Sequence, residues 1–225
     1  MNDMKQILCF GDSNTYGLIP GTKERYGWGV RWTSILDEKM RGHGYRVIEE
    51  GLCGRTTMFE DALRSGRRGT GMLPAILETH SPVELVILML GTNDCKTIYH
   101  ASPALIGCGI EQLLDQIRES NPLLPVLLVS PIHLGDSVWK MEYDPEFCRK
   151  SVEVSKDLPQ VYRQIADARR TGYLAASRYA EPSETDQEHM GKEGHRKLAE
   201  ALYRAALELI QTCGDPDNIP ESFCA

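Results

Sequence analysis

Short runs rich in apolar residues alternate along the chain with longer segments whose apolar positions recur every three or four residues. The runs at 7–10, 45–48, 83–90, 125–129 and 173–175 predict strands. The segments 32–40, 71–80, 104–118, 151–169 and 193–211 predict helices, and Pro159 is expected to break or kink the fourth of these. This alternation predicts an α/β fold with a parallel sheet wrapped by helices on both faces.

The chain is expected to form one domain over all of its 225 residues. It contains no internal repeat, low-complexity tract or composition shift that would indicate a linker. The last stretch, from Gly214 to Ala225, is rich in Pro and Asp and is expected to be peripheral. We therefore look for a single functional site rather than for one between domains.

Charge and composition exclude several classes of partner. The formal net charge is -7 and the charges are interspersed, so neither nucleic acid nor an anionic membrane is expected to bind. No apolar run has the length of a membrane span, and the N-terminal apolar stretch is too short for a signal peptide. The seven cysteines form no CxxC pair. A cytoplasmic protein is the expectation.

Small and polar residues follow three of the predicted strands, at 11–14, 51–54 and 91–94, and a fourth polar cluster at 186–195 precedes the last helix. Ligands of parallel sheets bind at the carboxyl ends of the strands, so the four clusters are expected to converge on one edge. That convergence carries more weight than any single motif.

Ser13 is the candidate nucleophile. A loop between a strand and a helix exposes the hydroxyl, and backbone N–H groups there can face an anion. Taken alone, Gly11-Asp12-Ser13-Asn14 is equally the composition of a turn and a helix cap, with Asp12 tying the loop through hydrogen bonds.

Asp186 and His189 are the candidate partners of Ser13. A base needs an imidazole, and the imidazole needs an acceptor on its other nitrogen, which a carboxylate three residues away can supply. His195 competes for the base role, but it is expected in the first turn of the last helix, where the positive end of the helix disfavours protonation. His189 is preferred because Asp186 is its partner at short range. A metal site made of the three residues is the alternative. It lacks the i, i+4 histidine spacing and any nearby cysteine, so no metal is expected.

Acyl transfer develops negative charge on the carbonyl oxygen, and fixed donors must meet it. The backbone N–H groups of Ser13 and Gly54 and the side-chain amide of Asn93 are the candidates, although a turn glycine and a turn asparagine are the plainer explanations of the last two.

Taken in order, Gly11-Asp12-Ser13, Gly54, Gly91-Thr92-Asn93-Asp94 and Asp186-x-x-His189 resemble the four blocks of the SGNH, or GDSL-like, hydrolases. The stretches 7–13, 47–52, 54–57 and 89–94 look like the bacterial arylesterase and acyltransferase branch. The resemblance covers about residues 6–210. It departs from the family at Asn14, where the signature has Leu, and at Gln187, where Gly commonly follows the acid.

The resemblance implies a three-layer α/β/α sandwich with a flavodoxin-like sheet, and hydrolysis of esters without metal or organic cofactor. Ser13 would attack, His189 would act as base and then acid, Asp186 would orient it, and Ser13, Gly54 and Asn93 would form the oxyanion hole. Some members form octamers, so a homo-oligomer is an expectation by analogy. The natural substrate, a small ester, is not specified further, and a carbohydrate acetylesterase or thioesterase of this fold is the alternative.

Other residues and other reactions compete with this assignment. Asp12 and Arg55 are weak candidates for substrate contact, and a structural arginine is the plainer interpretation of Arg55. The basic, glycine-rich run 64–69 lacks the spacing and lysine of a phosphate loop and is expected to be a surface or subunit-contact loop. Hydrolysis of phosphoryl or sulfuryl esters would need a metal or several cationic side chains at the site. A non-catalytic protein that binds acylated carbohydrate would need no triad, whereas all three triad residues are present here.

Overall fold

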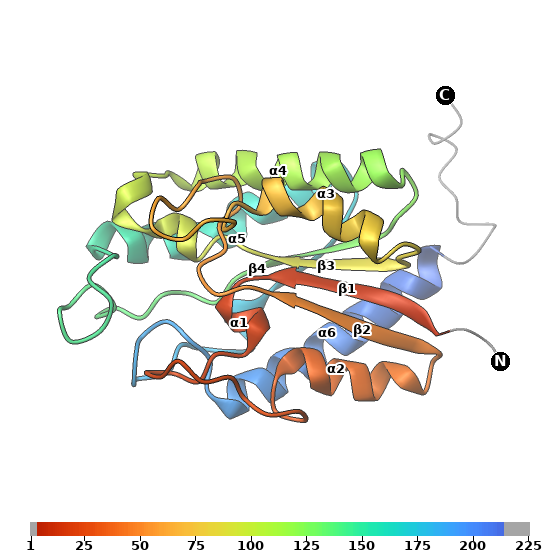
Figure 1. The fold of residues 1–225 in the computed structure, drawn as a ribbon, viewed down its shortest axis with the longest axis horizontal. Coiled ribbons are helices and arrows are strands. Elements are labelled where there is room, and N and C mark those ends of the chain that lie inside the picture. Colours follow the sequence, from red (N-terminus) through yellow and green to blue (C-terminus); the bar gives the residue numbers. More distant parts are fainter. Residues whose placement is uncertain (1–3, 214–225) are drawn as a thin grey trace.

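A five-stranded parallel sheet forms the centre of the molecule, in the order β2-β1-β3-β4-β5 (Figure 1). The computed structural model describes residues 4–213, so the segment 214–225, expected to be peripheral, lies outside the described residues. The strand order is that of flavodoxin-like folds, in which the crossovers reverse direction beside the first strand. The strands are β1 Lys5–Gly11, β2 Tyr45–Gly51, β3 Leu85–Met89, β4 Val126–Ser130 and β5 Gly172–Ala175.

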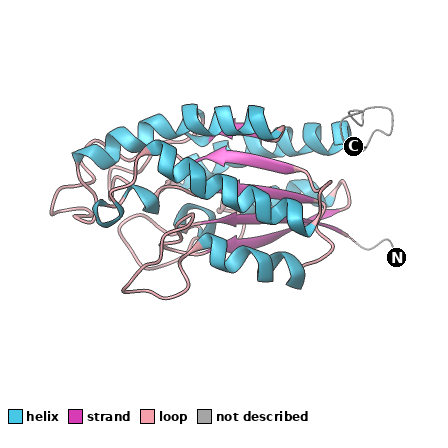
Figure 2. Ribbon diagram, turned by 90° about the horizontal axis from the view of Figure 1, so that it is seen from above, coloured by secondary structure: helices cyan, strands magenta, loops and turns pink. Residues whose placement is uncertain are grey.

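Helices cover both faces of the sheet, which gives three layers (Figures 1 and 2). One face carries α3 Gly69–Thr79, α4 Pro103–Ser120 and α5 Arg149–Arg169, and the other carries α2 Trp32–Arg41 and α6 Lys192–Cys213. A four-residue helix, α1 Ser13–Tyr16, follows β1 directly. The expected three-layer α/β architecture is therefore confirmed. Between residues 4 and 213, no helix is both long enough and apolar enough to cross a bilayer.

The apolar core lies in two clusters, one on each side of the sheet. Successive side chains of a strand point to opposite faces, so Leu8 and Phe10 join the cluster under α3, α4 and α5, whereas Ile7 and Cys9 join the cluster under α2 and α6. Every residue of β3 and of β4 is buried. The sheet is thus a rigid support for the loops that leave its carboxyl ends.

Helix α5 continues past Pro159, so of the expected break or kink, the break does not occur. A proline inside a helix removes one backbone hydrogen bond. Leu158 and Tyr162, on either side of it, are both fully buried, so the helix packs into the core before and after the proline. The carbonyl of Pro159 itself accepts a hydrogen bond from the Tyr173 hydroxyl at 2.7 Å.

Three strands end level with one another at the edge where the polar loops begin. Gly11 of β1 is the register partner of Gly51 in β2 and of Met89 in β3. Gly51 is required there, since a Cβ on it would stand 2.1 Å from the backbone nitrogen of Tyr16 in α1. The level strand ends bring the loops after β1, β2 and β3 together at one edge of the sheet.

Candidate active site

Ser13 is the first residue of α1 and comes two residues after the last residue of β1. The Asp12 side chain caps this short helix by accepting a hydrogen bond from the Asn14 backbone N–H at 3.0 Å. The turn is tight, because the Tyr16 and Gly17 N–H groups already bond to the carbonyls of Asp12 and Ser13. Ser13 is only 3% exposed, so its hydroxyl is held at the bottom of the site.

A chain of hydrogen bonds joins Ser13 to the fourth polar cluster. The Ser13 Oγ lies 2.9 Å from Nε2 of His189, and Nδ1 of the same ring lies 2.9 Å from Oδ2 of Asp186. The Asp186 carboxylate also accepts the backbone N–H groups of Gly21, Glu188 and His189 at 2.9–3.1 Å. In this arrangement the histidine can take the proton of the serine while the acid fixes the ring.

The pKa values of Asp186 and His189 shift in opposite directions, each toward the charged form of its group. Burial disfavours the Asp186 carboxylate, but hydrogen bonds from His189 and from backbone N–H groups outweigh burial and lower the pKa of Asp186. Burial likewise disfavours protonation of His189, yet the carboxylates of Glu188 and Asp186 raise the pKa of its imidazole to about 9. The surroundings of His189 therefore stabilise the imidazolium that proton transfer from Ser13 would create.

Two of the expected oxyanion donors, Gly54 and Asn93, lie in the segments that follow β2 and β3, whose ends are level with the end of β1. Gly54 has a φ of 82°, a left-handed conformation that favours glycine, in the loop after β2. Asn93, 2% exposed, donates through Nδ2 to the carbonyl of Arg55 at 3.1 Å, which fixes its amide against the residue that follows Gly54. Among the described residues, the backbone N–H groups of Ser13 and Gly54 donate to no acceptor. Donors of this kind are what a developing oxyanion requires.

Two buried polar contacts, neither of them expected from the sequence, lock the loops together. The Asp94 carboxylate accepts the backbone N–H of Thr57 at 3.0 Å and its hydroxyl at 2.5 Å, which ties the loop after β3 to the loop after β2. Asn14 accepts the Met190 N–H at 3.0 Å and donates to the Glu188 carbonyl at 3.3 Å. In the sequence, Asn14 and Asp94 are marked only by belonging to the motifs that contain Ser13 and Asn93.

Asp12 and Arg55, the weak candidates for substrate contact, hydrogen-bond to backbone groups of the protein. Both residues are buried, at 1% and 2% exposed. Asp12 caps α1, as described above. Arg55 donates to the carbonyls of Gly11 and Glu50, and its guanidinium lies 4.1 Å from the centre of the Phe10 ring. It ties the nucleophile loop to the loop after β2 from beneath the site.

His195 lies in the first turn of α6, as expected, and takes no part in the chain of hydrogen bonds. Its Nδ1 accepts the backbone N–H of Trp32 at 3.3 Å, and burial, reinforced by His189 and Arg31, lowers the pKa of the ring to about 4. Within residues 4–213 no three His, Cys, Asp or Glu side chains are placed to hold a metal ion. Both nitrogens of His189 are already engaged by Asp186 and Ser13.

The 64–69 run lies against the site. The loop is pinned by a hydrogen bond from the Thr56 N–H to the Arg67 carbonyl. The guanidinium carbon of Arg64 lies 3.1 Å from the position that a Cβ on Gly54 would occupy, and Arg64 is paired with Asp61 at 2.8 Å. Arg64 is thus a rim residue of the site that the sequence did not single out.

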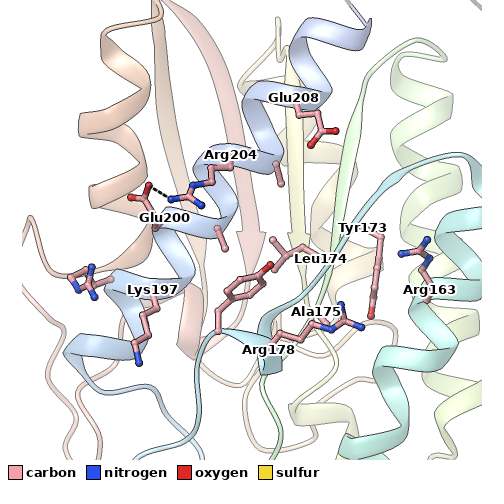
Figure 3. A pocket seen from close by; sticks show the side chains of 13 residues that line it. Arg163, Tyr173, Leu174, Ala175, Arg178, Lys197, Glu200, Arg204 and Glu208 are labelled. Atoms are coloured by element: carbon pink, nitrogen blue, oxygen red, sulfur yellow. Dashed lines mark hydrogen bonds and ion pairs between the residues drawn. The ribbon is translucent and has the colours of Figure 1, made fainter.

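A cavity of about 610 Å³ lies away from this site, between α5, β5 and α6 (Figure 3). Arg163, Arg178 and Arg204 are among its lining residues, and none of Ser13, Asp186 and His189 is. Since Arg204 is paired with Glu200 and Arg163 with Asp167, two of these cations are already matched by acids. We place the chemistry at Ser13 because the hydrogen-bonded chain is there.

The GDSL-like Lipase/Acylhydrolase family model matches residues 9–197, which includes every element described above from the end of β1 to the start of α6. The chain belongs to the GDSL-like lipase/acylhydrolase family. The resemblance inferred from the four motifs is therefore confirmed, and so is an ester hydrolase class of enzyme. No curated relative matches the chain.

Solved structures of this family superimpose closely on the chain. An aryl esterase of M. smegmatis is 32% identical with a TM-score of 0.84, over 91% of this chain and 99% of the other. A carbohydrate acetylesterase family member from Sinorhizobium meliloti is 33% identical with a TM-score of 0.83, over 92% and 100%. A lipase/acylhydrolase from Enterococcus faecalis, at 18% identity and a TM-score of 0.66 over 89% and 94%, shares the fold.

Proposed function

We propose that this family member is a serine esterase that removes small acyl groups from carboxylic esters through an acyl-enzyme on Ser13. The observation that carries the proposal is the chain from Ser13 Oγ to His189 Nε2 and from His189 Nδ1 to Asp186, with 2.9 Å at each link. The M. smegmatis aryl esterase and the S. meliloti carbohydrate acetylesterase are similar to the chain to nearly the same degree. Aryl esters and acetylated sugars are therefore the two substrate classes to compare.

In the first half-reaction the Ser13 oxygen bonds to the carbonyl carbon while its proton passes to Nε2 of His189. The carbonyl oxygen becomes an oxyanion, which the N–H groups of Ser13 and Gly54 and the Asn93 amide stabilise. The tetrahedral intermediate then expels the alcohol, which takes the proton from His189. This leaves the acyl group on Ser13 and the imidazole neutral again.

In the second half-reaction water, or another alcohol, enters where the first alcohol left. His189 accepts its proton as the new oxygen bonds to the acyl carbon, and then returns the proton to Ser13 as the acyl bond breaks. Asp186, which stays ionised, keeps the Nδ1–H of the ring pointed away from Ser13 throughout. Hydrolysis and acyl transfer differ only in the acceptor that enters.

Hydrolysis of p-nitrophenyl acetate, butyrate and octanoate tests the proposal, with an acetylated sugar as a further substrate. We expect Ser13→Ala and His189→Ala to lower kcat by about three orders of magnitude or more, because each removes a member of a cooperating triad. The exposed Ser120→Ala and His43→Ala are matched controls and should keep full activity. Activity should persist in EDTA. Full activity of Ser13→Ala would refute the serine mechanism, and loss of activity in EDTA would indicate metal-assisted hydrolysis instead.

A further inference from the structure

Glu188 is a buried acid directly beside the candidate general base. Its side chain is only 9% exposed, and Oε2 lies 3.8 Å from Nδ1 of His189. This is the same nitrogen that bonds to Asp186 at 2.9 Å, so the Nδ1–H of the ring faces two carboxylates. The reaction scheme above uses only one of them.

The backbone of Glu188 is fixed from both sides. Its N–H donates to the Asp186 carboxylate at 3.1 Å, and its carbonyl accepts the Asn14 amide at 3.3 Å. The position of the side chain is therefore set by two residues of the site itself. Among the described residues, neither carboxylate oxygen accepts a hydrogen bond, so the geometry suits an electrostatic partner rather than a structural bond.

We propose that Glu188 is a positioning residue for His189. Its carboxylate is a second counter-charge for the imidazolium that forms when Ser13 loses its proton, and it thereby sets the pH range over which the esterase works. The proposal rests on the proposed function, in which His189 is the base. A buried carboxylate 3.8 Å from a ring nitrogen stabilises positive charge on that ring.

The titratable groups around His189 come from three segments. His189 faces Asp186 and Glu188 of its own loop and Asp12 of the loop after β1, and all three raise the pKa of the ring against the effect of burial. His195 of α6 adds no charge near neutral pH, because its pKa is about 4. Glu188 is thus one of three acids around the histidine.

The same burial acts on Glu188. It raises the pKa of this carboxyl, as do Asp144 and Asp186, while His189 and Lys96 lower it. Lys96, whose ammonium is paired with Glu146, approaches from the segment after β3. Because His189 and Lys96 are the two cations that favour the Glu188 carboxylate, its charge depends on the protonation of the histidine.

Replacing Glu188 by Gln keeps the size of the side chain and removes the charge. The imidazolium then loses part of its stabilisation, so His189 releases its proton at lower pH and the free base is available at lower pH. We expect the midpoint of the acid limb of the kcat/KM profile to move down by about one pH unit or more. Each unit is a tenfold change in the acid dissociation constant of His189. Above the limb, kcat should fall, because the transition state contains the same imidazolium.

The profile is measured from about pH 5.5 to 10 with p-nitrophenyl acetate, for wild type, Glu188→Gln and the control Glu193→Gln. Glu193 is an exposed acid in the first turn of α6 and its replacement changes the net charge equally. In parallel, the imidazole of His189 is titrated by NMR in the Ser13→Ala background with and without Glu188→Gln. That titration needs no turnover, so it remains informative even if the serine mechanism fails.

A downward shift of about one unit or more in both measurements, absent in Glu193→Gln, supports the proposal. It is overturned if Glu188→Gln lowers kcat/KM by one factor at every pH, since that is the signature of a structural defect. It is also overturned if only one of the two midpoints moves. Should Glu188→Gln fold poorly, Glu188→Asp keeps the charge and should retain the wild-type midpoint, and a shift there would contradict the electrostatic role.

Discussion

Replacing Asn14 by Leu tests how the site is assembled. Asn14 departs from the family's Leu, and its amide joins the nucleophile loop to the loop of the histidine across 174 and 176 residues of sequence. The amide accepts the Met190 N–H at 3.0 Å and donates to the Glu188 carbonyl at 3.3 Å, and Asn14 is only 3% exposed. Leucine is similar in size and can make neither bond.

The cost follows from leaving two backbone groups buried without partners. Each such group costs about 1–3 kcal/mol, so the free energy of unfolding should fall by about 2–6 kcal/mol. For a chain of this size that lowers Tm by about 4–24 °C. The loop of His189 also loses its tether to Ser13. A misplacement of about 1 Å between reacting groups can cost a hundredfold, so kcat should fall by about ten- to a hundredfold.

Thermal unfolding and ester hydrolysis measure the two effects separately. The matched control is Asn121→Leu, because Asn121 is exposed and its Oδ1 also accepts a backbone N–H, from Leu123 at 3.0 Å. We expect the control to lose no more than about 1 kcal/mol and no activity. If Asn14→Leu has the same Tm as the control and hydrolyses esters at the wild-type rate, then the amide does not hold the two loops together. The argument from buried backbone groups would then be refuted at this position.

Two further changes test the packing beneath the site and its pH response. Gly51→Ala should destabilise the chain by about 1–3 kcal/mol, since its Cβ would stand 2.1 Å from the Tyr16 nitrogen, whereas Gly42→Ala, with its nearest neighbour at 3.9 Å, should be neutral in urea unfolding. For the buried His195, burial lowers the pKa from 6.5 to about 4. The stability that the neutral ring provides is therefore present above about pH 6.5 and is lost as pH falls towards 4. The loss is about 3 kcal/mol of unfolding free energy. Unfolding curves at pH 4.5 and 7 should differ less in His195→Asn than in wild type.

Much of the fold could be predicted because each strand and helix carries its own local pattern. The β3 run is apolar at every position from Leu85 to Met89, and in the structure all five residues are buried between helix layers. The convergence of the polar loops also followed from the sequence, because parallel strands with glycine-rich ends place those loops on one edge. A break at Pro159 was wrongly allowed for, because the local rule takes no account of the packing of Leu158 and Tyr162 in the core.

The site could be predicted only as far as its motifs reach. Ser13, His189 and Asp186 are brought together as expected, because strand order decides which loops meet. Arg64 was missed because its place over Gly54 depends on the path of the loop between β2 and α3, which has no periodicity to read. Glu188 was passed over as one more charge in a charged loop, and only its burial separates it from the exposed Glu184 nearby.

Two kinds of segment lie at the edge of the sheet. The motif loops hold the groups of the reaction, and the connecting segments between them present the surface that a substrate meets. The four motif loops are hydrogen-bonded to one another, by Asn14 to the loop of His189, by Arg55 to the nucleophile loop and by Asp94 to Thr57. The connecting segments that leave the same edge instead present exposed apolar side chains, at Trp28, Leu63, Ile98 and Met141. A substitution in the motif loops disturbs several hydrogen bonds at once. A substitution among the exposed side chains of the connecting segments alters the surface at little cost in stability. Ester chemistry on this fold can therefore persist while the alcohol or acyl group that it accepts changes.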